Sequence, residues 1–171
     1  VFDGLARAIK SVESDYDVVV VDCPPQLGYL TLSGLLAATG VLITIHPQML
    51  DVMSMSQFLA MLGDLVTVLS KAVSGAVPLD WMQYMLTRFE PNDGPQAQMA
   101  GFLRALLGDF VMTNATLKST AISDAGLTNQ TIYEVDRNQF TRATYDRAIE
   151  SVDAVNREIE ELILGSWGRT T

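Results

Sequence analysis

Cysteine, histidine and lysine are scarce in this chain of 171 residues. Its single cysteine, Cys23, excludes an internal disulfide framework, and its single histidine, His46, excludes a metal site built from several histidines. None of its lysines (Lys10, Lys71 and Lys118) follows a glycine. The phosphate-binding loop G-x-x-x-x-G-K-[ST] is therefore absent from these residues. No apolar run approaches the roughly 18 residues that a membrane-spanning helix needs.

The chain is acidic, with a formal net charge of −9 at pH 7. This charge disfavours nonspecific DNA binding, which depends on Lys and Arg neutralising phosphates. Five arginines nevertheless fall near the end of the chain: Arg137, Arg142, Arg147, Arg157 and Arg169. Acidic residues are interleaved with them, so the segment is either a solvated helix face with ion pairs or a DNA-binding patch.

Apolar residues make up 49% of the chain and alternate between helical and strand-like spacing. This alternation predicts an α/β fold with a mainly parallel sheet flanked by helices, in a single domain over residues 1–171. Residues 111–130 stay unassigned. Five helices are expected: an opening one with Phe2, Leu5, Ile9 and Val12 on one face, two at Leu30–Ala38 and Asp51–Ser70, one beginning near Pro95, and a last one that carries Ala148 to Ile163. Three strands are expected: Val18–Val21, Val41–Ile45 and one that ends near Phe89.

The four consecutive valines Val18–Val21 predict a strand that is buried on both faces. Asp22 follows at once, and Pro24 and Pro25 end the strand. Ligands of open parallel sheets bind beyond the carboxyl ends of strands, and a carboxylate there is suited to a nucleotide-bound Mg²⁺. The alternative is an aspartate that merely caps a core strand.

The run Asp22-Cys23-Pro24-Pro25-Gln26-Leu27-Gly28 resembles the Walker B strand and following loop of ParA/MinD-type ATPases. The resemblance continues through His46-Pro47 and Thr87-Arg88-Phe89 and covers the whole chain in order. It is strongest to the RepA branch, the ParA-like ATPases of repABC plasmid replication and partition systems. It implies a P-loop NTPase-like fold.

The resemblance assigns roles to residues on the phosphate side of a nucleotide. Asp22 is implied as the catalytic carboxylate that holds Mg²⁺, usually through water. Pro24, Pro25 and Gly28 are implied as the loop that senses the γ-phosphate. Because proline fixes φ and glycine permits positive φ, the same three residues also suit any sharp strand-to-helix turn.

On the base side, the resemblance places Thr87, Arg88 and Phe89 near the adenine. Arg can stack on a base and Phe can form a pocket wall, although helix capping or loop packing would also explain these residues. Lys118 is implied as a nucleic-acid-binding residue, and its alternative is an ordinary solvated lysine.

For the intact protein, the resemblance implies a plasmid-partition ATPase that uses ATP and Mg²⁺. Two subunits would sandwich ATP, the ATP-bound homodimer would bind DNA nonspecifically, and a ParB-like partner (RepB) would stimulate hydrolysis. This would take place on the nucleoid in the bacterial cytoplasm, without a membrane.

Because the chain begins at Val1 and lacks the phosphate loop, it is interpreted as the C-terminal part of such an ATPase. Alone it is expected to be inactive, and to fold only with its upstream half or in an unusual rearrangement.

Two other functions stay open. One is a non-catalytic interaction module on the same fold. The other is a MinD-like positioning ATPase, which needs a basic amphipathic anchor helix. The short, acidic end of this chain, with Glu158, Glu160 and Glu161, disfavours the second.

Overall fold

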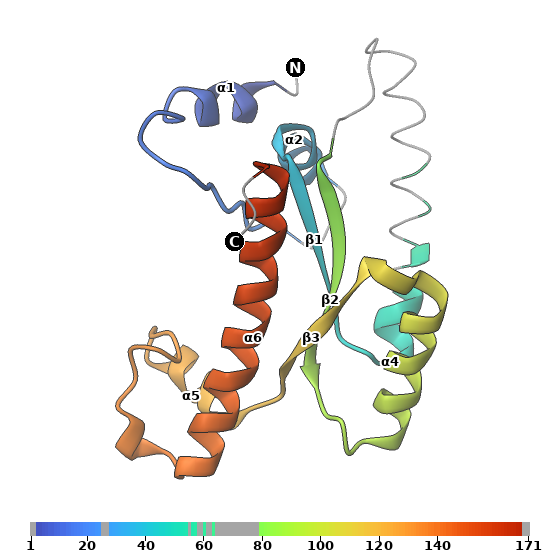
Figure 1. Ribbon diagram of the computed structural model, residues 1–171, viewed down its shortest axis with the longest axis vertical. Helices are drawn as coiled ribbons and strands as arrows, with labels where there is room; N and C mark the ends of the chain where they lie inside the picture. Colours follow the sequence, from blue (N-terminus) through green and yellow to red (C-terminus); the bar gives the residue numbers. More distant parts are fainter. Residues whose placement is uncertain are drawn as a thin grey trace. The chain divides into compact units, whose positions relative to one another are not determined.

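The computed structural model describes residues 3–24, 28–54, 79–168 and the single positions 56, 57, 60 and 63 (Figure 1). By its internal contacts the chain divides into two compact units. The first comprises Val1–Val41 with Met55–Trp81, and the second comprises Leu42–Ser54 with Met82–Thr171.

A three-stranded sheet with the order β1-β2-β3 organises the second unit. The strands are β1 (Gly40–Ile45), β2 (Trp81–Phe89) and β3 (Val111–Leu117), and β2 pairs with β3 in parallel. The predicted strand Val41–Ile45, the strand end at Phe89 and the parallel α/β class are thereby confirmed.

Helices α4 (Gly94–Leu107) and α6 (Arg142–Ser166) both contact β3, and the β2–β3 pair runs between them in Figure 1. A helix-start signal begins each one: the Asp93 carboxylate accepts from the Gln96 N–H, and the Thr141 hydroxyl accepts from the Thr144 N–H. Leu86, Leu103 and Met112 are almost fully buried and form the centre of this core.

Helix α5 (Thr120–Leu127) packs against α6 through a small second cluster. Its buried members are Ala121, Ala125, Ile132, Val135 and Ala148. Two short 3₁₀ turns, η1 (Gly108–Phe110) and η2 (Arg137–Gln139), also belong to this unit. Among the helices that the structure describes, none is both long enough and apolar enough to cross a membrane.

The first unit contains α1 (Gly4–Lys10) and α2 (Tyr29–Ala37), which pack against each other. They confirm the opening helix and, within one residue, the helix expected at Leu30–Ala38. Gly34 of α2 lies against Cys23, because a Cβ at Gly34 would approach the Cys23 Sγ to 2.9 Å. Cys23 therefore touches a helix, although the residue as a whole is exposed.

The strand predicted at Val18–Val21 is wrong for this chain. These residues adopt no strand, and all four valines are exposed, with Val20 at 88%. A strand exists only where a neighbour accepts and donates its backbone hydrogen bonds. No described residue range provides such a neighbour beside Val18–Val21, so the apolar run stays in an irregular conformation.

Two further segments differ from the elements expected from the sequence. The strand β3 and helix α5 lie within the unassigned residues 111–130. The long helix expected at Asp51–Ser70 begins at Met49 and is observed at the described positions up to Gly63; its remaining residues lie outside the described part of the chain.

Candidate functional site

The carboxyl ends of the strands bring together several residues that are far apart in the sequence. His46 follows β1, Arg88 and Glu90 lie at the end of β2, and Lys118 follows β3. Phe89 pairs with Leu117, and the Lys118 N–H donates to the Phe89 carbonyl at 3.1 Å. Because ligands of parallel sheets bind at this edge, the arrangement is the strongest candidate site of the second unit.

Arg88 has an unusual backbone conformation, with φ of 51°. This left-handed conformation is disfavoured for residues other than glycine, and such strain concentrates at functional sites. It coincides with an irregularity in the β2–β3 register between Leu86 and Phe89. The result is an exposed Arg88 side chain flanked by the half-buried Thr87 and Phe89.

Lys118 forms an ion pair with Glu90, with 2.8 Å between Nζ and Oε1. This hydrogen bond from Lys118 is the main cause that lowers the pKa of the Glu90 carboxyl, and the charge of Lys118 and a hydrogen bond from Gln96 act in the same direction. Both side chains remain about half exposed. Lys118 therefore has an anionic partner in the structure, and its side chain also faces solvent.

A buried glutamine fixes the loop that carries Glu90. Gln96 is 2% exposed, and its side-chain oxygen accepts from the Glu90 N–H at 3.0 Å. Its amide nitrogen donates to Asp93 at 3.2 Å and to the Glu90 carboxylate at 3.4 Å. Gln96 thus orients the carboxylate that in turn holds Lys118.

His46 makes a contact of its own beyond β1. Its Nδ1 lies 3.1 Å from a carboxylate oxygen of Asp51, at the start of the following helix. His46 is thus a residue that connects a strand end to a helix start.

Of the residues predicted for the phosphate side, three belong to described parts of the first unit. Asp22 is exposed. The Pro24 carbonyl accepts a hydrogen bond from the Thr31 hydroxyl at 3.2 Å, which ties the loop to α2. Gly28 precedes α2 with φ of −107°, a conformation that any residue adopts. Pro25 lies outside the described residues.

The donor chemistry of Asp22 suits Mg²⁺ on a nucleotide. Mg²⁺ is commonly held in such sites by one or two carboxylates together with phosphate oxygens and water. An exposed, single carboxylate fits that pattern. Over the described ranges no three His, Cys, Asp or Glu side chains form a cluster that would hold a metal by protein ligands alone.

Sequence reasoning singled out neither Glu90 nor Gln96. One sequence signal could have identified Glu90, because it directly follows the predicted site residues Thr87-Arg88-Phe89. Gln96 had none, because a glutamine near a helix start is ordinarily a surface residue.

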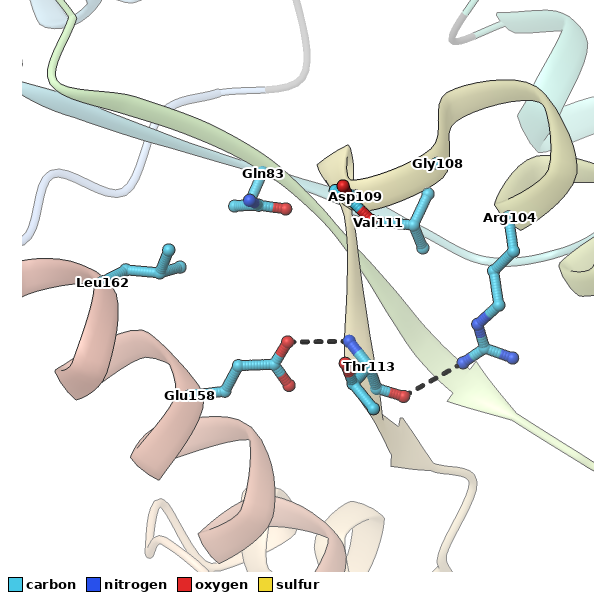
Figure 2. Close-up of a pocket in the computed structure, with 8 residues that line it drawn as sticks. All are labelled: Gln83, Arg104, Gly108, Asp109, Val111, Thr113, Glu158 and Leu162. Carbon is cyan, nitrogen blue, oxygen red and sulfur yellow. Dashed lines mark hydrogen bonds between the residues drawn. The ribbon is translucent and has the colours of Figure 1, made fainter.

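A second polar feature is a cleft of about 600 Å³ at the opposite, amino-terminal ends of β2 and β3 (Figure 2). Its walls come from β2, η1, β3, α4 and α6. The residues that line it include Gln83, Arg104, Asp109, Val111, Glu158 and Leu162. None of them was singled out as a site residue from the sequence.

Comparison with known proteins gives a consistent relationship. A family model described as an AAA domain matches residues 3–74. The chain is 61% identical over 168 residues to "Putative replication protein A" of Sinorhizobium fredii and 58% identical over 170 residues to that of Rhizobium rhizogenes. It is 28% identical over 167 residues to "Protein SopA" of Escherichia coli.

These matches include nearly the whole chain but not the whole of the relatives. The three alignments cover 98%, 99% and 95% of this chain, and 41%, 42% and 42% of the respective relatives. The chain thus spans about two fifths of the length of the curated relatives it matches. A solved structure titled "Partition Protein" superposes with a TM-score of 0.67 at 17% identity, covering 90% of this chain and 38% of the other, which supports the fold alone. The resemblance to ParA-type ATPases is confirmed.

Proposed function

We propose that this chain is the Mg²⁺-binding and base-contacting part of an ATPase that partitions plasmids. The observation that carries the proposal is the edge of the sheet where Arg88, Phe89 and Lys118 meet, although their positions in the sequence span some 30 residues. The similarity to proteins named for replication and partition supports the same function.

Each proposed role follows from the chemistry of a side chain. Asp22 would hold Mg²⁺, and the ion would supply positive charge that offsets the charge of the phosphates. The Arg88 guanidinium stacks on the adenine, and Phe89 forms an apolar wall beside it. Thr87 lies one residue earlier on the same strand end and donates or accepts through its hydroxyl.

The loop after Asp22 is the proposed sensor of the γ-phosphate, with Pro24, Pro25 and Gly28. The bond between the Thr31 hydroxyl and the Pro24 carbonyl supports this role, because it would transmit a movement of the loop to α2.

Lys118 is the proposed contact to nucleic acid. Since Glu90 neutralises it, a DNA phosphate must displace the Glu90 carboxylate before Lys118 is available. The proposal extends to the whole protein: one domain over residues 1–171 within a homodimer that encloses ATP, a ParB-like partner that stimulates hydrolysis, and a place on the nucleoid in the cytoplasm.

A chimera provides the test. These residues would replace the matching segment of the Sinorhizobium fredii relative, to which they are 61% identical. We expect the chimera to hydrolyse ATP in the presence of Mg²⁺, and Asp22→Asn to reduce turnover by about a hundredfold or more, as is typical when charge stabilisation at a reacting phosphate is removed. The 171-residue chain alone should show no turnover, because it has no phosphate-binding loop.

Asp17→Asn is the matched control. Asp17 is also exposed and precedes the same valine run, so it removes an equal charge from the same segment. Equal loss of turnover in both variants would contradict a specific role of Asp22. An inactive parent chimera that nevertheless binds Mg-ATP would also contradict the proposal.

The exposed Val18–Val21 favours a second candidate, a non-catalytic interaction module. Such a module would use the apolar run as a contact surface. In the chimera it would predict undiminished plasmid maintenance after Asp22→Asn, whereas the ATPase proposal predicts plasmid loss.

A further inference from the structure

The cleft at the amino-terminal ends of β2 and β3 holds one buried hydrogen-bond acceptor that no described residue satisfies, and an exposed carboxylate lies at the same cleft. The side-chain oxygen of Gln83 is buried, and no residue in the described ranges donates a hydrogen bond to it. Asp109 lines the same cleft, and no described residue forms an ion pair with it. A buried acceptor without a donor is energetically unfavourable, so the cleft favours an occupant that donates hydrogen bonds.

The other polar residues of the cleft are already engaged and make its wall rigid. Glu158 accepts from the Thr113 N–H at 2.7 Å and from the Asn114 N–H at 2.9 Å. Arg104 donates to the Thr113 carbonyl at 3.2 Å, as the dashed lines in Figure 2 show. These bonds clamp the Thr113–Asn114 segment, where two extra residues of β3 interrupt the pairing with β2.

The acceptors and their surroundings indicate the chemistry of the occupant. Asp109 is suited to a cation, and the Gln83 amide can turn its oxygen toward the cleft because its terminal torsion is broad. Val111 and Leu162 offer apolar surface for an alkyl stem. Arg104 has further N–H groups, which suit a backbone carbonyl like the one it already binds.

We propose that this cleft docks a peptide segment of a partner protein that carries a lysine or arginine side chain. The cationic head pairs with Asp109 and the Gln83 oxygen, the stem lies against Leu162, and Arg104 donates to a carbonyl of the segment. The net charge of −9 on this chain attracts such a basic segment. The site lies at the sheet edge opposite Glu90 and Lys118, and it does not depend on the proposed nucleotide chemistry.

NMR titration of the ¹⁵N-labelled 171-residue chain tests the proposal, with the peptide acetyl-Ala-Lys-Ala-amide as the probe and acetyl-Ala-Glu-Ala-amide as its control. We expect saturable shifts of the Asp109 and Thr113 amides and of the Gln83 side-chain amide with the lysine peptide alone. Asp109→Asn should weaken binding about tenfold, as the loss of a charge-assisted hydrogen bond does.

Asp124→Asn is the matched variant, since it removes the same charge from an exposed position on α5. It should change the affinity by less than about twofold, as remote surface charges do. Gln83→Leu should weaken binding without lowering the melting temperature, which separates a binding role from a structural one. Equal weakening by Asp109→Asn and Asp124→Asn, equal binding of the glutamate peptide, or no saturable shift at these amides would each overturn the proposal.

Discussion

The segment Val18–Val21 and the strand β3 show opposite relations between apolar sequence and burial. Val18–Val21 is a continuous run of valines, and it is exposed without regular structure. β3 contains Thr113, Asn114 and Thr116, and it forms a strand. Its first residues, Val111 and Met112, are nearly fully buried.

The difference lies in the neighbours of the two segments. β3 pairs with β2 on one side, is covered by α6, and has its two unpaired amides capped by Glu158. Val18–Val21 has no strand beside it within the described ranges. Apolar composition indicates that a segment is suited to burial, and only the presence of partners decides whether burial occurs.

The largest effect should distinguish a core position from this exposed run. Leu86→Ala on β2 is expected to lower the free energy of unfolding by about 2–5 kcal/mol, because Leu86 is fully buried and its removal leaves a cavity. Val20→Ala should change it by about 0.5 kcal/mol or less, as exposed substitutions do. Urea unfolding followed by circular dichroism measures both. If Val20→Ala lowered the free energy of unfolding as much as Leu86→Ala, the contrast between the two segments would be wrong, because the valine run would then be buried in solution.

The caps on β3 should give the next largest effect. Glu158→Gln replaces a carboxylate that accepts three N–H groups from Thr113 and Asn114. We expect the free energy of unfolding to fall by about 1–3 kcal/mol, because backbone donors lose a carboxylate acceptor. Glu160→Gln is the control, being exposed on the same helix. If the two variants were equally stable, the irregular part of β3 would not depend on its cap.

The smallest effect concerns the ion pair at the carboxyl ends of β2 and β3. Lys118 lowers the pKa of Glu90 in the folded state below its ordinary value of 4.5. The pair therefore stabilises the fold fully above that ordinary value, and this contribution is lost as the pH falls through the lowered folded pKa. The melting temperature of the wild type should lie slightly above that of Glu90→Gln at pH 7, and the two should converge as the pH falls through the lowered folded pKa.

Lys118→Met supplies the control for this pH dependence. In that background, Glu90→Gln should leave the melting temperature nearly the same at every pH. A difference that persisted without Lys118 would show that Glu90 acts through Gln96 instead of the ion pair.

Much of the fold could be predicted from the sequence, because the local hydrophobic patterns of the second unit agree with its tertiary structure. The helical spacing up to Ile163 and the strand at Val41–Ile45 correspond to α6 and β1. β3 was missed because its polar residues are bound by Glu158 and Arg104, and contacts over such sequence distances leave no periodic pattern.

The candidate site could be predicted from the sequence to a similar degree. The motif at Thr87-Arg88-Phe89 and the isolated Lys118 pointed to two separate features, and the parallel pairing of β2 with β3 joins them. The bond of Lys118 to Glu90 and the left-handed conformation of Arg88 depend on three-dimensional neighbours, so no sequence pattern announced them.

The central claim is that Asp22 functions at the end of a strand formed by Val18–Val21. This strand is expected to form only when further residues, such as those that the longer relatives contain, lie beside it. Amide hydrogen exchange at Val18–Val21 tests it most directly, in the 171-residue chain and in the Sinorhizobium fredii chimera. We predict rapid exchange in the chain alone, as its exposed valines require, and strong protection in the chimera. Rapid exchange in both would contradict the account, because Asp22 would then have no strand to position it.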